Sequence, residues 1–131
     1  MPFPVDMRFI EELETDLGLS FPEKFTTKMT IENGGEFQTD EDEWTLFPFL
    51  DKSDNKRISR TCNHIGLETA NAKEWENFPA DAVAIGENGF GDLLILLPDK
   101  SIPSKLTDNI FVWLHETGEI YELAENINSI D

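Results

Sequence analysis

Cysteine and basic residues are scarce in this sequence, and both scarcities exclude classes of structure and function. The single cysteine, Cys62, cannot form an internal disulfide, and no second thiol exists to share a zinc site. Only 10 lysines and arginines stand against 27 acidic residues, which gives a formal net charge of −17. Because this charge repels phosphate groups, we expect no direct binding to nucleic acid or to an anionic membrane.

The sequence also lacks long hydrophobic runs. No stretch approaches the length of a membrane span, and residues 1–20 carry five acids and an arginine where a secretory signal would be apolar. We therefore expect a cytoplasmic protein. The length of 131 residues and the 39% hydrophobic content suit one domain over residues 1–131, with a core dominated by a few of its ten phenylalanines and three tryptophans.

The hydrophobic pattern predicts a pair of helices at the start of the chain. Residues 6–17 have apolar side chains at helical spacing, with Asp6 available as the N-cap and Gly18 as the stop. A second helix is expected to begin near Pro22, which suits a first turn, and to end at Asn33-Gly34-Gly35, which can adopt positive φ.

The middle of the chain predicts a loop followed by a helix. Residues 51–63 are polar and rich in turn formers, and they hold four of the ten basic residues, so we expect a loop or mobile insertion. Residues 66–78 predict a helix with Leu67, Ala70 and Trp75 on its buried side.

Short apolar runs separated by turn residues predict a sheet. These runs are EWTLFPFL, AVAIGE, DLLILL, IFVWLH and EIYEL. Helices first and paired strands later indicate an α+β fold with a mostly antiparallel β-sheet flanked by helices, because alternating βαβ units are absent from the pattern.

The segment AIGENGFGDLLILLPD raises the question of a nucleotide site. Gly86, Gly89 and Gly91 follow the dinucleotide fingerprint in the wrong order, and a strand follows them where a phosphate site needs a helix N-terminus. Asn88-Gly89 is the preferred dipeptide of a two-residue type I′ turn. We therefore expect a β-hairpin here and no cofactor.

Two acidic segments are candidate partner contacts. The run of residues 40–43 lacks the alternating spacing of a Ca²⁺ loop, so we expect no metal there. Trp44 follows directly and is either the aromatic anchor of an interface or a core residue. The candidate contacts are Glu36, Asp40, Glu41, Asp42, Glu43, Trp44, Glu87 and Asp92.

No catalytic group can be assembled from the sequence. Cys62 and His64 alternate in a polar segment without an identifiable third group to orient them. His115 and Glu116 lie where the last two strands are expected to turn. We therefore expect structural or solvent-facing roles for these residues and no enzyme activity, although a hydrolase that uses an unassigned pair of carboxylates stays open.

Four motifs, in order along nearly the whole chain, resemble the SMI1/KNR4 family of the SUKH superfamily. The motifs are IEELETDLGLSFPEKF, ENGGEF, AVAIGENGFGDLLILL and IFVWLHETGEIYEL. The matching residues are Leu17, Gly18, Pro22, Asn33, Gly34, Gly35, Ile85, Gly86, Gly89, Gly91 and Asp92. The resemblance implies an α+β fold with an N-terminal helical pair, structural roles for the motif glycines, and no catalytic site.

The resemblance also implies a function in protein binding. Bacterial members are implicated as immunity proteins that neutralise toxins, often nucleases, and fungal members are linked to cell-wall regulation. We therefore expect a non-enzymatic inhibitor, monomeric or weakly dimeric, of a basic toxin domain. The alternative is a regulatory scaffold that acts through other protein contacts. An acidic surface suits a basic partner because complementary charge speeds and orients association.

Overall fold

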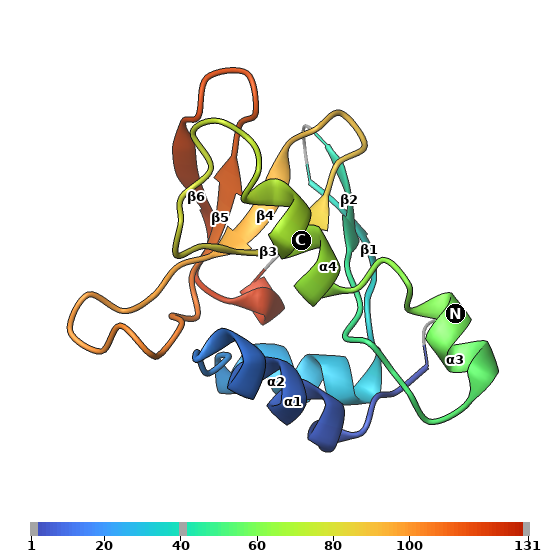
Figure 1. Cartoon of the computed structure of the whole chain (residues 1–131). Coiled ribbons are helices and arrows are strands. Elements are labelled where there is room, and N and C mark those ends of the chain that lie inside the picture. The colour runs from blue at the N-terminus through green and yellow to red at the C-terminus, as the bar shows by residue number, and fades with distance from the viewer. Residues whose placement is uncertain (1–2, 40–41, 130–131) are drawn as a thin grey trace.

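A computed structural model describes residues 3–39 and 42–129 (Figure 1). Its helices are α1 (Met7–Leu17), α2 (Glu23–Ile31), α3 (Asn55–Arg60), α4 (Ile65–Ala72) and the short 3-10 helix η1 (Ile127–Ser129). Its strands are β1 (Gly35–Gln38), β2 (Glu43–Leu46), β3 (Val83–Glu87), β4 (Leu93–Leu96), β5 (Ile110–Trp113) and β6 (Ile120–Ala124).

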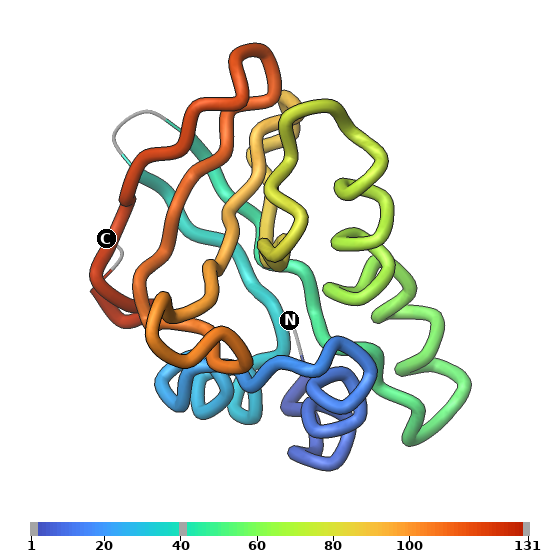
Figure 2. The backbone as a smooth tube through the Cα atoms, turned by 60° about the vertical axis from the view of Figure 1, so that its left-hand side comes forward, coloured from blue at the N-terminus to red at the C-terminus, as the bar shows by residue number. Residues whose placement is uncertain are grey.

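The six strands form one antiparallel sheet in the order β1-β2-β3-β4-β5-β6, so each strand pairs with its neighbours in sequence. Helices α1 and α2 lie together across one end of the strands, and α4 lies against β3 (Figure 1). The tube view shows that the sheet curls (Figure 2). The predicted α+β fold and its N-terminal helical pair are confirmed.

The two ends of α1 follow from local sequence signals. The side chain of Asp6 accepts a hydrogen bond from the backbone N–H of Arg8 at 2.9 Å, which satisfies one of the free donors of the first turn. Gly18 adopts a φ of 69° and ends the helix, because glycine enters the left-handed region without the steric cost that a Cβ brings. Both predictions are confirmed.

The Asn33-Gly34-Gly35 motif ends α2 and leads into β1. Asn33 is buried, and its side-chain amide donates to the carbonyl of Phe49 at 2.9 Å. Its side-chain oxygen accepts from the backbone N–H of Phe49 at 2.8 Å. The motif therefore connects the end of α2 to the segment that follows β2.

Helix α3 corrects the prediction of a loop over residues 51–63. Asp54 caps the helix by accepting from the backbone N–H of Arg57 at 2.8 Å. The side chain of Thr61 donates to the carbonyl of Arg57 at 2.7 Å and accepts from the backbone N–H of Asp51 at 3.0 Å. These hydrogen bonds order a polar segment that buries no side chain of the helix itself.

Helix α4 is shorter than predicted and buries a different face. It ends at Ala72, and the side chains of Leu67 and Trp75 are exposed. The buried positions include Thr69, whose hydroxyl accepts from the backbone N–H of Ala84 at 3.0 Å. The buried face of α4 thus combines the apolar Ile65 and Ala72 with a hydrogen bond from the backbone of β3.

Substitution of Gly86 by alanine is expected to lower the free energy of unfolding by about 2 kcal/mol, because an added Cβ overpacks the centre of the sheet. That Cβ would lie 2.8 Å from the carbonyl oxygen of Thr45 on β2 and 3.2 Å from Cδ1 of Leu94 on β4. Urea denaturation of the purified variant measures the change.

Gly89→Ala is the comparison, because Gly89 has a φ of 83° with no atom within 4 Å of an added Cβ. Its cost is confined to backbone strain of about 1 kcal/mol. If the Gly86→Ala variant were as stable as the unchanged protein, the close packing of β2 and β4 around Gly86 would not be what requires glycine at this position.

Candidate functional site

Three hairpin loops lie at the same end of the sheet, the upper end in Figure 1, and we call this region the hairpin-loop end. Among the described residues it comprises 39, 42, 88–92 and 114–119. Side chains connect neighbouring loops: the amide nitrogen of Asn88 donates to Oδ1 of Asp42 at 3.4 Å, and Nδ1 of His115 lies 2.8 Å from Oδ1 of Asp92. The loops therefore form one continuous surface.

The β3–β4 hairpin is confirmed, but the predicted two-residue turn is wrong. Glu87 pairs with Leu93, which leaves five residues in the loop. A type I′ turn would need positive φ at both Asn88 and Gly89. Instead the positive φ angles belong to Gly89 and Gly91, at 83° and 102°.

The Asn88 side chain orders this five-residue loop. Its oxygen accepts from the backbone N–H groups of Phe90 and Asp92, at 2.9 and 3.3 Å. Its nitrogen donates to Oδ2 of Asp92 at 3.1 Å as well as to Asp42. Such side-chain bonds to nearby backbone are typical of asparagine in turns. The loop is held in one conformation before any partner binds.

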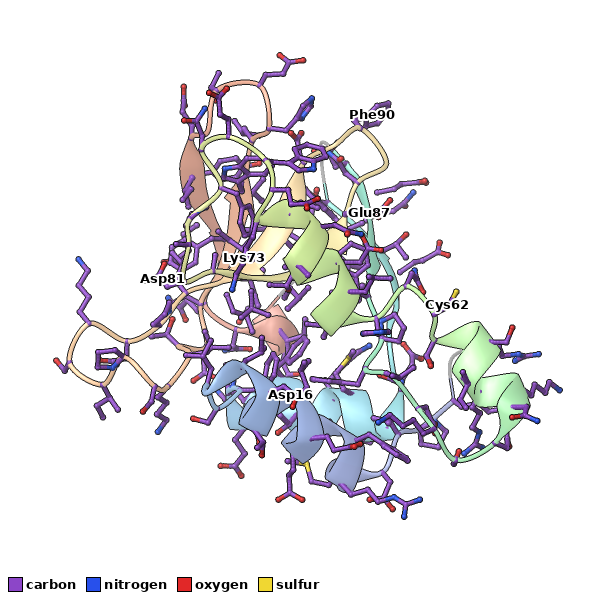
Figure 3. All side chains as sticks on the ribbon, viewed as in Figure 1. Asp16, Cys62, Lys73, Asp81, Glu87 and Phe90 are labelled. Carbon is purple, nitrogen blue, oxygen red and sulfur yellow. The ribbon has the colours of Figure 1, made fainter. Side chains whose placement is uncertain are left out.

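Phe90 lies at the tip of this loop and is 76% exposed (Figure 3). A phenylalanine ring is apolar, so its exposure on an ordered loop leaves unused the free energy that burial would release. Aromatic side chains, phenylalanine among them, are enriched at protein–protein interfaces relative to the rest of the protein surface. Phe90 is therefore the most prominent candidate anchor at the hairpin-loop end.

Asp92 joins the β3–β4 loop to the β5–β6 loop. Its Oδ1 accepts from the backbone N–H of His115 at 3.1 Å and contacts the imidazole of the same residue. Partial burial alone would raise the pKa of the Asp92 carboxyl, but the hydrogen bonds from His115 and Asn88 outweigh it and the pKa is lowered. Asp92 is thus a charged group that fixes both loops.

A hollow of about 360 Å³ opens between the two loops beside Phe90. It is lined by Phe90, Asp92, Leu114, His115, Glu116 and Thr117. The hollow combines one aromatic wall with two carboxylates, and Glu116 is exposed. An apolar wall beside carboxylates suits the long stem and cationic head of a lysine or arginine side chain.

The surroundings of the hollow are strongly acidic. The described residues 36–39, 42–46, 85–93 and 113–120 together hold seven acids and no lysine or arginine. Glu36 and Glu43 are exposed, and Glu87 is partly exposed. The pKa of Glu68 on α4 is raised by burial and by the charge of Glu87. These charges add to a negative potential at this end of the molecule.

The predicted contacts differ in where they lie. Glu36 and Glu87 flank Thr45 across the sheet, and Asp42 adjoins the β3–β4 loop. Asp40 and Glu41 lie outside the described residues. The part that Glu36, Asp42, Glu43, Glu87 and Asp92 play in partner binding stays a prediction.

The prediction of Trp44 as an interface anchor is wrong. Its side chain is 1% exposed and belongs to the hydrophobic core. Alternation along β2 explains this burial, because Trp44 and Leu46 point inward while Glu43 and Thr45 face solvent. The aromatic residue exposed on the β3–β4 loop is Phe90, whose signal in the sequence is an apolar side chain between two turn glycines.

The histidines have structural partners. Nδ1 of His64 accepts from the backbone N–H of Leu67 at 3.2 Å and caps α4. Burial, and secondarily the charge of Lys52, lowers the pKa of His64. Cys62 is exposed two residues earlier.

Within residues 3–39 and 42–129, no three His, Cys, Asp or Glu side chains are grouped as metal ligands would be. No helix in these ranges is long and apolar enough to cross a membrane.

Comparison with known proteins identifies the family to which the chain belongs. No curated protein matched the chain. The model of the SMI1 / KNR4 family (SUKH-1) matches residues 4–130, which is nearly the entire chain. The matched range includes all four motifs identified above, which run from within α1 to within β6. The chain therefore belongs to the SMI1/KNR4 family.

Proposed function

We propose that this protein is an immunity protein that binds and neutralises a basic toxin domain through its hairpin-loop end. The observation that carries the proposal is Phe90, an exposed aromatic side chain on a loop that hydrogen bonds already order. Ordering before binding lowers the entropy that association costs. Phe90 thus has the exposure and the rigidity expected of an interface anchor.

The charge around Phe90 supports a basic partner. The hollow beside the ring offers carboxylates to a lysine or arginine, and the neighbouring strands add further acids without a compensating base. A basic nuclease presents such side chains in the groove that receives phosphates, so an acidic protein surface can occupy the same groove. Inhibition would then follow from occupation of the substrate site.

The family supports the same class of function. The SMI1/KNR4 family is generally linked to immunity proteins of toxin systems and to domains without catalytic activity. We propose that this protein likewise acts by binding and not by catalysis, as one domain in the cytoplasm and as a monomer or weak homodimer. Its candidate contacts are Phe90 together with the acids of the hairpin-loop end.

Growth rescue tests the proposal. Bacteria are made to express a toxin domain encoded beside the gene for this chain, with or without the chain itself. The proposal expects co-expression to restore growth and the two purified proteins to form a stoichiometric complex. Loss of growth despite full expression of the folded chain, together with capture of a cell-wall or signalling component, would favour the regulatory scaffold instead.

Association with the toxin domain is expected to slow by about tenfold or more when the ionic strength rises from about 0.01 to about 0.15 M, because the Debye length shortens from about 30 to about 8 Å. Stopped-flow mixing at several salt concentrations measures the association rate. The dissociation rate should change much less, since contacts in the bound complex are only weakly screened. An association rate that varies by less than about twofold would contradict electrostatic steering.

A further inference from the structure

A second cavity lies beside α3. Helix α3 itself lies apart from the hairpin-loop end (Figure 1). The volume of the cavity is about 290 Å³, close to the lower limit for small-ligand sites. Phe3, Leu46 and Pro48 give it apolar walls, while Arg57 and Arg60 bring positive charge to it. A cavity with two arginines is unexpected in a chain whose net charge is −17.

The two arginines are held in place before any ligand arrives. They lie three residues apart on α3, so both side chains project from the same side of the helix. Their guanidinium carbons lie 4.8 and 4.9 Å from the centre of the Phe3 ring. Cation–π contact with one ring restricts both side chains, which reduces the entropy lost when they bind an anion.

One of the two charges is compensated and the other is not. Nη1 of Arg57 lies 3.9 Å from Oδ2 of Asp51, a carboxylate whose side chain is 3% exposed. Ser53 donates to the other oxygen of Asp51 through its backbone and hydroxyl, at 3.0 and 2.6 Å. The guanidinium of Arg60 has no hydrogen bond or ion pair to any residue in the described ranges, and neither does the amide of Asn63, which also lines the cavity.

From this arrangement we infer that the cavity binds a carboxylate carried on an apolar group. One uncompensated guanidinium balances one negative charge, and its planar donors match the two oxygens of a carboxylate. A dianionic phosphate would leave excess negative charge in a protein that already carries −17. The apolar walls would receive the carrier, which is either a small organic acid or the last residue of a peptide.

Titration of the ¹⁵N-labelled protein with benzoate tests the inference. Benzoate is expected to shift the amide signals of Gly34, Gly35 and residues 57–63 and to reach saturation. Benzamide, which has the same shape without the charge, should bind about tenfold more weakly because it loses the charge-assisted hydrogen bonds. Equal binding of both compounds, or shifts confined to other regions, would overturn the inference.

Arg60→Gln and Lys56→Gln provide the matched variants. Both remove one positive charge from α3, but only Arg60 lines the cavity. Arg60→Gln should weaken benzoate binding about tenfold, whereas Lys56→Gln should change it less than about twofold. Amide spectra of the free variants show that each is folded. If the two substitutions weakened binding equally, benzoate would be responding to the overall surface charge of α3 and not to a specific site, and the inference would be overturned.

Two peptides separate the sources of the carboxylate. A short peptide that ends in phenylalanine is used with its C-terminal carboxylate free or amidated. If the free form competes with benzoate and the amide does not, the site accepts a peptide C-terminus. If neither competes while benzoate still binds through Arg60, the natural carrier is a small organic acid. The inference concerns the cavity beside α3, which shares no lining residue with the hollow at the hairpin-loop end, so it holds or fails independently of toxin binding there.

Discussion

Replacing Phe90 with alanine is expected to weaken binding to the toxin domain by about 30-fold or more, the change in Kd that corresponds to the loss of about 2 kcal/mol at an interface anchor. The substitution removes the aromatic side chain that lies against the acidic hollow. It should leave the free energy of unfolding within about 0.5 kcal/mol of its original value, because the ring is exposed. Calorimetric titration measures Kd, and urea denaturation measures stability.

Ile31→Ala is the matched control for this experiment. Ile31 is 71% exposed, almost as much as Phe90, but it belongs to α2 at the opposite end of the strands (Figure 1). Its removal should leave Kd unchanged within about twofold. Equal losses from both substitutions, or no loss from Phe90→Ala, would show that the partner does not bind where we propose.

Replacing Asn33 with alanine is expected to lower the free energy of unfolding by about 3 kcal/mol. The substitution removes both hydrogen bonds between the Asn33 side chain and the backbone of Phe49. The N–H and C=O groups of Phe49 then stay buried without partners, and each such group costs about 1–3 kcal/mol. Urea or thermal denaturation of the purified variant measures the loss.

Two further substitutions show whether the loss comes from these hydrogen bonds. Asn33→Asp keeps the size of the side chain, but a carboxylate cannot donate to the Phe49 carbonyl, so stability should not be restored. Asn71→Ala removes an exposed asparagine from α4 and should change stability by less than about 0.5 kcal/mol. Full stability of Asn33→Asp would indicate that the donated bond contributes little.

Features set by neighbouring residues could be predicted from the sequence. The limits of α1 follow from Asp6 and Gly18, whose effects act within one turn of the helix. The order of strands β3 to β6 follows from apolar runs separated by turn residues. The family motifs added the family itself, because their order along the chain is specific even where each motif is weak.

Features set by distant residues could not be predicted. The length of the β3–β4 loop depends on Asn88, which bonds to Asp42 in another hairpin as well as to its own loop. The buried face of α4 includes Thr69, a polar residue accepted there because its hydroxyl bonds to β3. A pattern that ranks positions by apolar character assigns such a residue to solvent. Trp44 was open for a different reason, because an aromatic side chain beside an acidic run suits an interface anchor as well as a core residue.

The cavity beside α3 shows that a candidate binding site, too, could not be predicted from neighbouring residues alone. The four basic residues of 52–60 are adjacent in sequence, but Phe3 and Leu46, which complete the cavity, come from distant segments. Only the folded chain brings the Phe3 ring within cation–π distance of both arginines. The basic residues of this polar segment therefore predict local positive charge, but the binding site itself can be recognised only in the folded structure.

The placement of three hairpin loops at one end of the sheet has a consequence for how new binding specificity can arise. The hydrophobic core lies along the strands, and α1 and α2 lie at the opposite end of the sheet from these loops (Figure 1). Exposed loop residues such as Phe90 and Glu116 can therefore be replaced at little cost in stability. Mutational drift can thus alter the recognised partner while the scaffold persists. The exceptions are Asn88 and Asp92, which any such divergence must retain or replace with other loop-ordering contacts.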